Sequence, residues 1–261
     1  MKTVQTLLTR WIACALVLAV LLPLLGCESG PRQRRLVPPT VTVAPYSTAG
    51  GDLLFAVVPL RNESGVGSVD TMRVGDAIVG AVAQVNGLRC LPLNRTVEAM
   101  RAEGLASVST PEEARLLADR LGVDGLLLGS VTAFDPYNPP TLGLSLALLG
   151  RTQAMAVPAS GVDTRSLRYQ PTEWNYFPDS RFADGPASAV SEHLDARRHD
   201  IQMAVRAHAT GRDDERYPLG WERYMLSMDL YTEFAAAFAV ARLLDAEAAR
   251  LARSERQMSG R

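Results

Sequence analysis

The chain has 261 residues, and its 27 Lys and Arg residues nearly balance 28 Asp and Glu residues, giving a formal net charge of −1. The cations are interleaved with acidic residues, which excludes the basic stripe that nucleic-acid binding needs. The three cysteines, Cys14, Cys27 and Cys90, are too few for a disulfide framework.

The N-terminus has the parts of a secretory signal. Lys2 and Arg10 supply the positive charge, residues 11–22 are apolar, and Leu24-Leu25-Gly26-Cys27 follows. The apolar run is shorter than the about 20 residues that a membrane-spanning helix needs. The last four residues resemble the lipobox of bacterial lipoproteins. The resemblance implies that residues 1–26 are removed as a lipoprotein signal peptide and that Cys27 carries acyl chains.

The segment after the cleavage site predicts a tether. Residues 27–51 contain prolines and a Gly-Gly pair, which break regular elements, so we expect a flexible link between lipid and domain. Cys27 is followed by Glu28-Ser29 instead of the aspartate associated with inner-membrane retention, which favours the outer membrane. Cys90 is then the one thiol left, and its apolar neighbours predict that it is buried and inert.

The first part of the domain predicts alternating strands and helices. Residues 53–58 form an apolar strand, and a helix starts at Asp70, a plausible N-cap, and continues to 86. We expect a second strand over 88–93. A short helix is predicted over 95–102.

Between residues 110 and 150, specific residues mark where each predicted element begins and ends. Thr110-Pro111-Glu112-Glu113 is typical of a helix start with a capping box, and this helix should end at Gly122. A strand over 123–131 and a turn over 135–140 follow. In 141–150, leucines alternate with small residues. This alternation is compatible with a half-buried sheet strand, a membrane-spanning strand of about ten residues, or an oligomerising edge.

Two short motifs resemble the TolB N-terminal domain and the curli-secretion lipoprotein (CsgG-like) family. They are Val57-Val58-Pro59-Leu60-Arg61-Asn62-Glu63-Ser64-Gly65 and Leu121-Gly122-Val123-Asp124-Gly125-Leu126-Leu127-Leu128-Gly129. The likeness covers the domain at 52–150. It implies an α/β (α+β) fold, a mixed sheet with helices packed on one face, in an envelope protein that binds other proteins.

The remaining chain departs from that family pattern. Residues 151–217 look like an insertion, in which 162–169 offers a strand and 187–209 a helix. Its irregular middle holds a candidate partner-binding cluster of four aromatics: Trp174, Tyr176, Phe177 and Phe182. Residues 218–261 predict a long C-terminal helix that packs on the domain. Its apolar stripe has helical spacing: Trp221, Tyr224, Met228, Tyr231, Ala235 and Phe238.

No catalytic, metal-binding or cofactor-binding pattern stands out in the sequence. His193, His199 and His208 are spaced by six and nine residues, whereas a helical metal pair needs four. The loop at 61–68 lies between a strand and a helix but lacks the ending of a phosphate-binding loop. We therefore expect a non-enzymatic, metal-free protein.

The predicted function is that of a membrane-anchored, periplasm-facing lipoprotein, a binding or scaffold component of cell-envelope assembly or secretion. Its partners would be the membrane, through the lipid, and other envelope proteins. One alternative is a subunit of an outer-membrane secretion pore, although only one amphipathic spanning strand is found. Another is a small-ligand or hydrolytic activity at loop 61–68.

Overall fold

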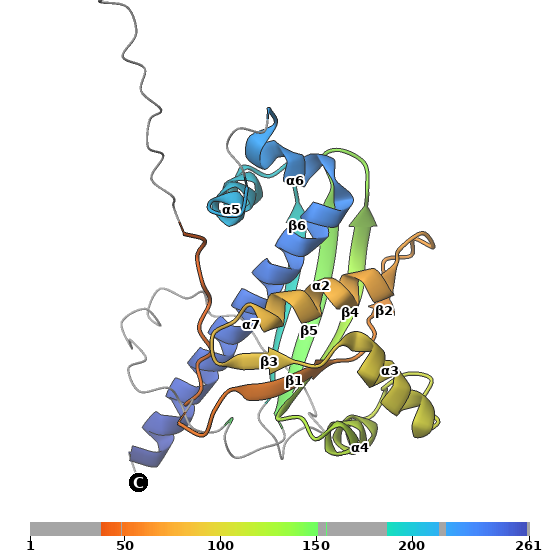
Figure 1. Cartoon of the computed structure of the whole chain (residues 1–261), viewed down its shortest axis with the longest axis vertical. Coiled ribbons are helices and arrows are strands. Elements are labelled where there is room, and N and C mark those ends of the chain that lie inside the picture. The colour runs from red at the N-terminus through yellow and green to blue at the C-terminus, as the bar shows by residue number, and fades with distance from the viewer. Residues whose placement is uncertain (1–37, 48, 151–154, 156–186, 214–217, 260–261) are drawn as a thin grey trace, which may run out of the picture. The chain divides into compact units, whose positions relative to one another are not determined.

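A mixed β-sheet organises the chain between Pro38 and its C-terminus (Figure 1). The computed structural model describes residues 38–47, 49–150, 155, 187–213 and 218–259, of which residues 187 and 254–259 are described by their backbone alone. The strands are β1 (Leu53–Val57), β2 (Arg61–Asn62), β3 (Leu88–Cys90), β4 (Gly125–Asp135), β5 (Thr141–Gly150) and β6 (Ala187–Asp195).

The sheet has the order β3-β1-β4-β5-β6, and β2 pairs separately with β4. The pairs β3–β1 and β1–β4 are parallel, whereas β4–β5 and β5–β6 are antiparallel. The mixed sheet, the packed helices and the long C-terminal helix confirm the predicted fold class. The helices are α2 (Thr71–Ala83), α3 (Leu93–Ala102), α4 (Pro111–Leu121), α5 (His199–Ala209), η4 (Gly220–Glu222), α6 (Arg223–Leu226) and α7 (Met228–Ser259).

Side-chain caps fix the ends of α2 and α4 as the sequence predicts. The Asp70 carboxylate accepts a hydrogen bond from the backbone N–H of Arg73 at 3.0 Å. Thr110 and Glu113 form the reciprocal capping box, with Thr110 Oγ1 accepting from the Glu113 N–H at 3.2 Å. Gly122 ends α4 at φ 66°, in the left-handed region that glycine adopts without strain.

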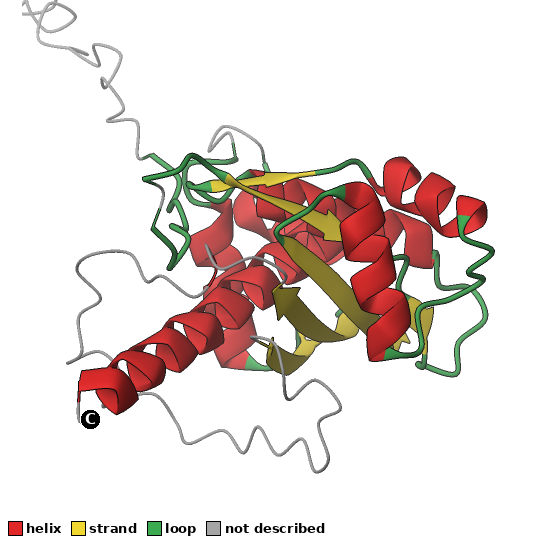
Figure 2. Ribbon diagram, turned by 90° about the horizontal axis from the view of Figure 1, so that it is seen from below, coloured by secondary structure: helices red, strands yellow, loops and turns green. Residues whose placement is uncertain are grey.

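Helices cover both faces of the sheet (Figure 2), which corrects the expectation of a single covered face. Along β1, Phe55 and Val57 point into a core shared with α2 and α7. Ala56 points the other way, into a second core with α3 and α4. The parallel strands carry apolar side chains on both faces of the sheet, so helices must pack on each face to bury them.

The alternating strand predicted at 141–150 is an interior strand of the sheet. β5 pairs with β4 on one side and with β6 on the other. Leu142, Leu144, Leu146 and Leu148 are at most 1% exposed and face the core that α7 covers. This arrangement confirms the sheet-strand interpretation over the membrane-spanning and edge interpretations.

The helix predicted over 187–209 is wrong in its first half. Residues 187–195 form β6, and the helix begins at His199. Within β6, Ser188, Val190 and Leu194 are buried with a two-residue period. Its local sequence, with two Ala and two Ser residues among nine, carries no clear strand signal, so pairing with β5 decides its conformation. The alternative strand at 162–169 lies outside the described residues.

The predicted C-terminal helix exists with one interruption. Ser227 has an extended backbone, φ −116° and ψ 115°, which separates α6 from α7. α7 lies across the front of β5 and β6 in Figure 1 and also packs on α2. Tyr224, Tyr231 and Ala235 of the predicted stripe are buried. Trp221, Met228 and Phe238 are partly buried against the same core.

The end of the predicted tether belongs to the domain. Val43 forms a parallel bridge with Asn86, and the Ala44 N–H donates to the Asn86 carbonyl at 2.9 Å. Tyr46 is 1% exposed and packs against Phe55 with ring centroids 6.3 Å apart. The expectation of a loose coil is therefore wrong at residues 42–46, because a backbone bridge and a buried aromatic ring outweigh the local prolines.

Candidate functional site

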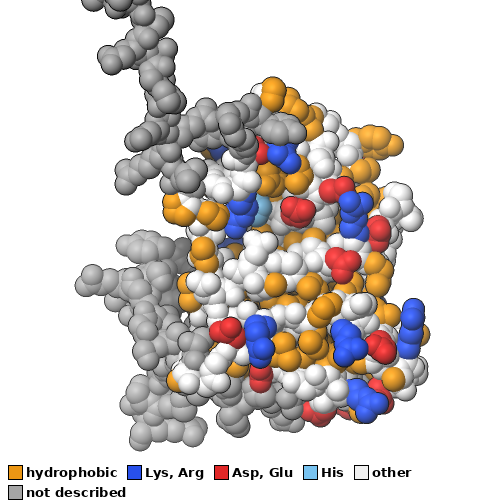
Figure 3. Space-filling model, in the orientation of Figure 1, with side chains coloured by type: hydrophobic (Ala, Val, Ile, Leu, Met, Phe, Trp, Pro, Cys, Tyr) orange, Lys and Arg blue, Asp and Glu red, His pale blue; other side chains and the backbone are white. Residues whose placement is uncertain are grey.

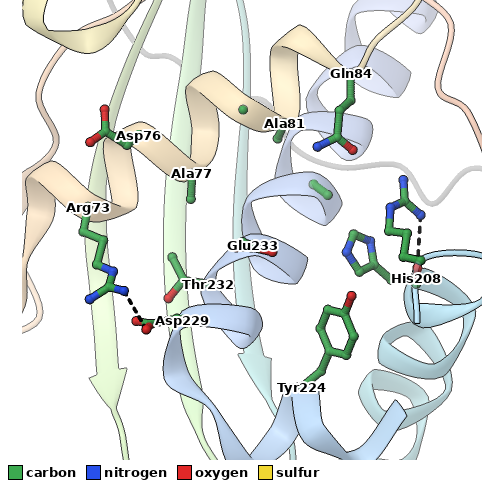
Figure 4. A pocket seen from close by; sticks show the side chains of 13 residues that line it. Arg73, Asp76, Ala77, Ala81, Gln84, His208, Tyr224, Asp229, Thr232 and Glu233 are labelled. Carbon is green, nitrogen blue, oxygen red and sulfur yellow. Dashed lines mark hydrogen bonds and ion pairs between the residues drawn. The ribbon is translucent and has the colours of Figure 1, made fainter. Parts of the chain in front are cut away.

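An open groove lies between the helices of the domain (Figure 4). Its floor is formed by α2 with the first half of α7, and the wall opposite the floor by the end of α5 with α6. Its volume is about 450 Å³. Figure 3 shows basic and acidic side chains interspersed with apolar ones on the face of the domain seen in Figure 1. We call this the α2–α7 groove. Its lining residues used below are Arg73, Asp76, Ala77, Gly80, Ala81, Gln84, His208, Arg212, Tyr224, Asp229, Glu233 and Ala237.

The floor of the groove consists of small side chains. Ala77, Gly80 and Ala81 are spaced by three and four residues and therefore share one face of α2, and Ala237 joins them from α7. A Cβ atom built on Gly80 would meet no atom within 4 Å. By contrast, a Cβ on Gly75, one and a half turns earlier in α2, would lie 2.8 Å from Leu93 Cδ2. The helix therefore presents open space at Gly80 and a packed contact at Gly75.

Two rings form the wall opposite the floor. Figure 4 shows His208 and Tyr224 projecting toward each other from α5 and α6. Their ring centroids are 5.6 Å apart at 82°, and His208 makes a similar edge contact with Phe234 at 5.7 Å. Burial, and then the charge of Arg212, lower the pKa of His208 to about 4. The imidazole is therefore neutral at physiological pH, and the wall offers apolar ring surface with a polar tip.

Charged groups of both signs surround the groove. Arg73 of α2 pairs with Asp229 of α7 at 2.6 Å across its floor (Figure 4). Asp76 and Glu233 add carboxylates on the same two helices. Arg212, just after α5 on the wall opposite the floor, donates to the His208 carbonyl at 3.0 Å. These side chains are largely exposed and therefore stay hydrated. Exposed charges of this kind form weak, reversible polar contacts.

The chemistry of this arrangement fits a polypeptide segment. A floor of alanines and glycine admits a close backbone approach, the rings supply apolar contact, and charges of both signs can pair with a mixed sequence. Within the part of the chain that the structure describes, no three His, Cys, Asp or Glu side chains gather as metal ligands. The described helices include none with the length and hydropathy to cross a bilayer.

The structure does not test several of the residues singled out in the sequence. Cys27 and the aromatic cluster Trp174, Tyr176, Phe177 and Phe182 lie outside the described residues. Their proposed lipid and partner roles therefore stay predictions. Cys90 is half-buried as a free thiol, and burial raises its pKa to about 12, as expected for an inert cysteine.

Loop 61–68 is a tight connector whose polar groups bond to the loop itself. Asn62 Oδ1 accepts from both the N–H and the hydroxyl of Ser64, at 3.1 and 2.7 Å. Its amide group donates to the Val66 carbonyl at 2.9 Å. Arg61 and Asn62 pair with β4 as the short strand β2. These contacts account for the Asn-x-Ser-Gly pattern through turn formation.

The α2–α7 groove was not predicted from the sequence. The sequence presents His208 only as a candidate metal ligand and gives no signal at Gly80 by itself. Four elements build the groove, and α2 is separated from α5, α6 and α7 by more than a hundred residues, so no local sequence pattern predicts it. The one available signal was the run of small residues on one face of α2, which also fits ordinary helix packing.

Comparison with known proteins shows distant similarity of fold. No family model and no curated protein sequence matches the chain. The LpoB C-terminal domain from Salmonella enterica is 18% identical over 45% of this chain and 79% of that one, with a TM-score of 0.33. Lipoprotein GNA1162 from Neisseria meningitidis is 15% identical over 59% and 94%, with a TM-score of 0.34. The PelC dodecamer from Paraburkholderia phytofirmans is 13% identical over 61% and 83%, with a TM-score of 0.28.

At these TM-scores and identities, the likenesses carry no argument about the role of this chain. The comparisons assign no sequence family, so the resemblance to the TolB and curli-secretion families remains a prediction from two motifs.

Proposed function

We propose that this protein is a lipid-anchored component of the bacterial envelope, with the outer membrane favoured. It would act by binding a polypeptide segment of another envelope protein in the α2–α7 groove, not by catalysis. The observation that carries the binding role is the open space above Gly80, between the alanine floor and the His208–Tyr224 wall. The anchor is supported by Leu24-Leu25-Gly26-Cys27.

The groove offers a test in which binding and stability separate. Gly80→Trp places a large ring in the groove without a clash at Cβ, so the folded domain should tolerate it while the segment is displaced. Gly80→Ala is the matched control, because it leaves the groove open and should raise helix stability by about 0.5–1 kcal/mol.

Site-specific photocrosslinking in intact envelopes provides the readout. A benzophenone amino acid at Gln84, on the groove rim, should give a discrete crosslinked partner, and the same probe at Leu116 on α4 should not. The crosslink should persist with Gly80→Ala and disappear with Gly80→Trp. Equal crosslinking from Gln84 and Leu116, or a crosslink insensitive to Gly80→Trp, would refute the groove as the binding site.

The anchor has its own test. Cys27→Ser should abolish incorporation of a labelled fatty acid and processing at that position. Label retained on the Ser variant would contradict the lipoprotein proposal, whatever the outcome at the groove.

A further inference from the structure

The large apolar side chains exposed on the described residues are unevenly distributed. Three lie on separate elements: Met72 on α2, Leu116 on α4 and Tyr137 in the β4–β5 turn. The other five come from residues 41–43, from α5 and from the flanks of η4 and α6: Val41, Val43, Met203, Leu219 and Leu226. Their exposed fractions range from 39% to 65%.

The elements that carry those five side chains are neighbours. The Arg212 guanidinium, just after α5, donates to the Thr40 carbonyl at 3.4 Å, which places residues 40–43 beside that helix. α5 in turn packs against η4 and α6. Figure 1 shows α5, α6 and the start of the described chain at the same end of the domain. Isolated apolar side chains need no explanation, but several on adjoining elements indicate an interaction surface.

The chain enters the domain at this end. From Cys27 to Pro38 there are 11 peptide steps, which span at most about 38 Å when fully extended. Residues 42–46 contact Asn86 and Phe55 in the domain, so they do not lengthen the link between Cys27 and the domain. A lipid on Cys27 would therefore limit the point where the chain enters the domain to within about 38 Å of the bilayer. The intervening segment carries Arg32, Arg34 and Arg35, which anionic headgroups attract.

We infer that the end of the domain formed by residues 40–43, α5 and α6 is a lipid-docking surface. Leu219, Leu226 and Met203 would enter the headgroup region, so that the domain lies on the membrane in a fixed orientation. The inference rests on the proposed anchor at Cys27, since a lipid there is what brings this end to a bilayer. It adds an orientation that the anchor alone does not impose.

Vesicle binding by the unlipidated protein tests the surface separately from the anchor. The mature chain with Cys27→Ser should cosediment with vesicles of phosphatidylethanolamine and phosphatidylglycerol. Adding Leu226→Asp or Leu219→Asp should lower the partition coefficient about tenfold or more, because a carboxylate replaces an inserting leucine. Leu116→Asp is the matched control, since Leu116 is 48% exposed against 49% for Leu219, and it should change the coefficient less than about twofold.

A fluorescence readout identifies lipid as the occupant. With Trp174→Phe, Trp221 in η4 is the one tryptophan of the chain from Cys27 onward. Brominated lipids should quench it in the parent and not in Leu226→Asp, and melting curves should show both folded. Absent vesicle binding, or an equal loss with Leu116→Asp, would overturn the lipid surface. Because Gly80→Trp should leave vesicle binding intact, failure here is distinguishable from failure of the groove proposal.

Discussion

Glu247 and Arg250 form an ion pair inside the domain, one turn apart on α7. Glu247 is 1% exposed, and Arg250 donates to it through Nη2 at 2.6 Å and through Nε at 2.9 Å. The Ser188 hydroxyl on β6 also donates to this carboxylate. The pair therefore joins the edge strand, which the sequence did not predict, to the C-terminal helix.

Removal of one partner should be costly. Glu247→Leu leaves the Arg250 guanidinium without its buried counter-charge and should reduce the free energy of unfolding by about 3–5 kcal/mol. Chemical denaturation measures the change. The double variant Glu247→Leu with Arg250→Leu should recover much of the loss, because both charges of the pair are removed together. A single variant as stable as the parent would contradict this account.

Tyr46 should behave as a core residue although it precedes the predicted domain. Tyr46→Ala removes a ring packed on Phe55 and should destabilise the fold by about 3–5 kcal/mol. Tyr137→Ala is the control, because that side chain is 80% exposed, and its effect should stay within about 0.5 kcal/mol. Equal melting temperatures for the two variants would mean that residues 42–46 are not packed as part of the domain.

The capping box of α4 gives a smaller effect. Thr110→Ala loses the hydrogen bond from the Glu113 N–H and should cost about 0.5–2 kcal/mol. Thr110→Ser keeps a hydroxyl acceptor and should restore most of that loss. Denaturant midpoints compare the three proteins, and an unchanged midpoint for Thr110→Ala would show that the cap does not stabilise α4.

Stability should depend on pH through His208. Its pKa is lowered to about 4 in the folded protein from an ordinary value near 6.5, so the unfolded chain takes up the proton first as the pH falls. The contribution of the neutral ring to stability is therefore complete above pH 6.5 and is lost as the pH falls toward 4. His208→Phe removes this group and keeps the ring contacts.

The readout is the difference in unfolding free energy between the parent and His208→Phe at each pH. Carboxylates titrate in both proteins and cancel in the difference. The parent should lose stability relative to the variant between pH 6.5 and 4. A constant difference over that range would mean that the pKa of His208 is not lowered by burial beside Tyr224 and Phe234.

The sequence determined the elements whose signals are local. Asp70 and the Thr110–Glu113 box mark two helix starts because a capping side chain needs only its own backbone neighbours within three residues. The leucine alternation of β5 is equally local, since the pleat of a strand sends successive side chains to opposite faces. The lipobox-like segment before Cys27 is also a local pattern, and it remains the basis of the proposed anchor.

The tertiary structure decided what depends on partners distant in the chain. Residues 187–195 form a strand because they pair with the edge of β5. Residues 42–44 belong to the domain because their backbone bonds to the backbone of Asn86. The α2–α7 groove exists because α5, α6 and α7 meet α2 across more than a hundred residues. Long-range hydrogen bonding and burial override weak local propensity, and for that reason the groove is absent from any short stretch of sequence.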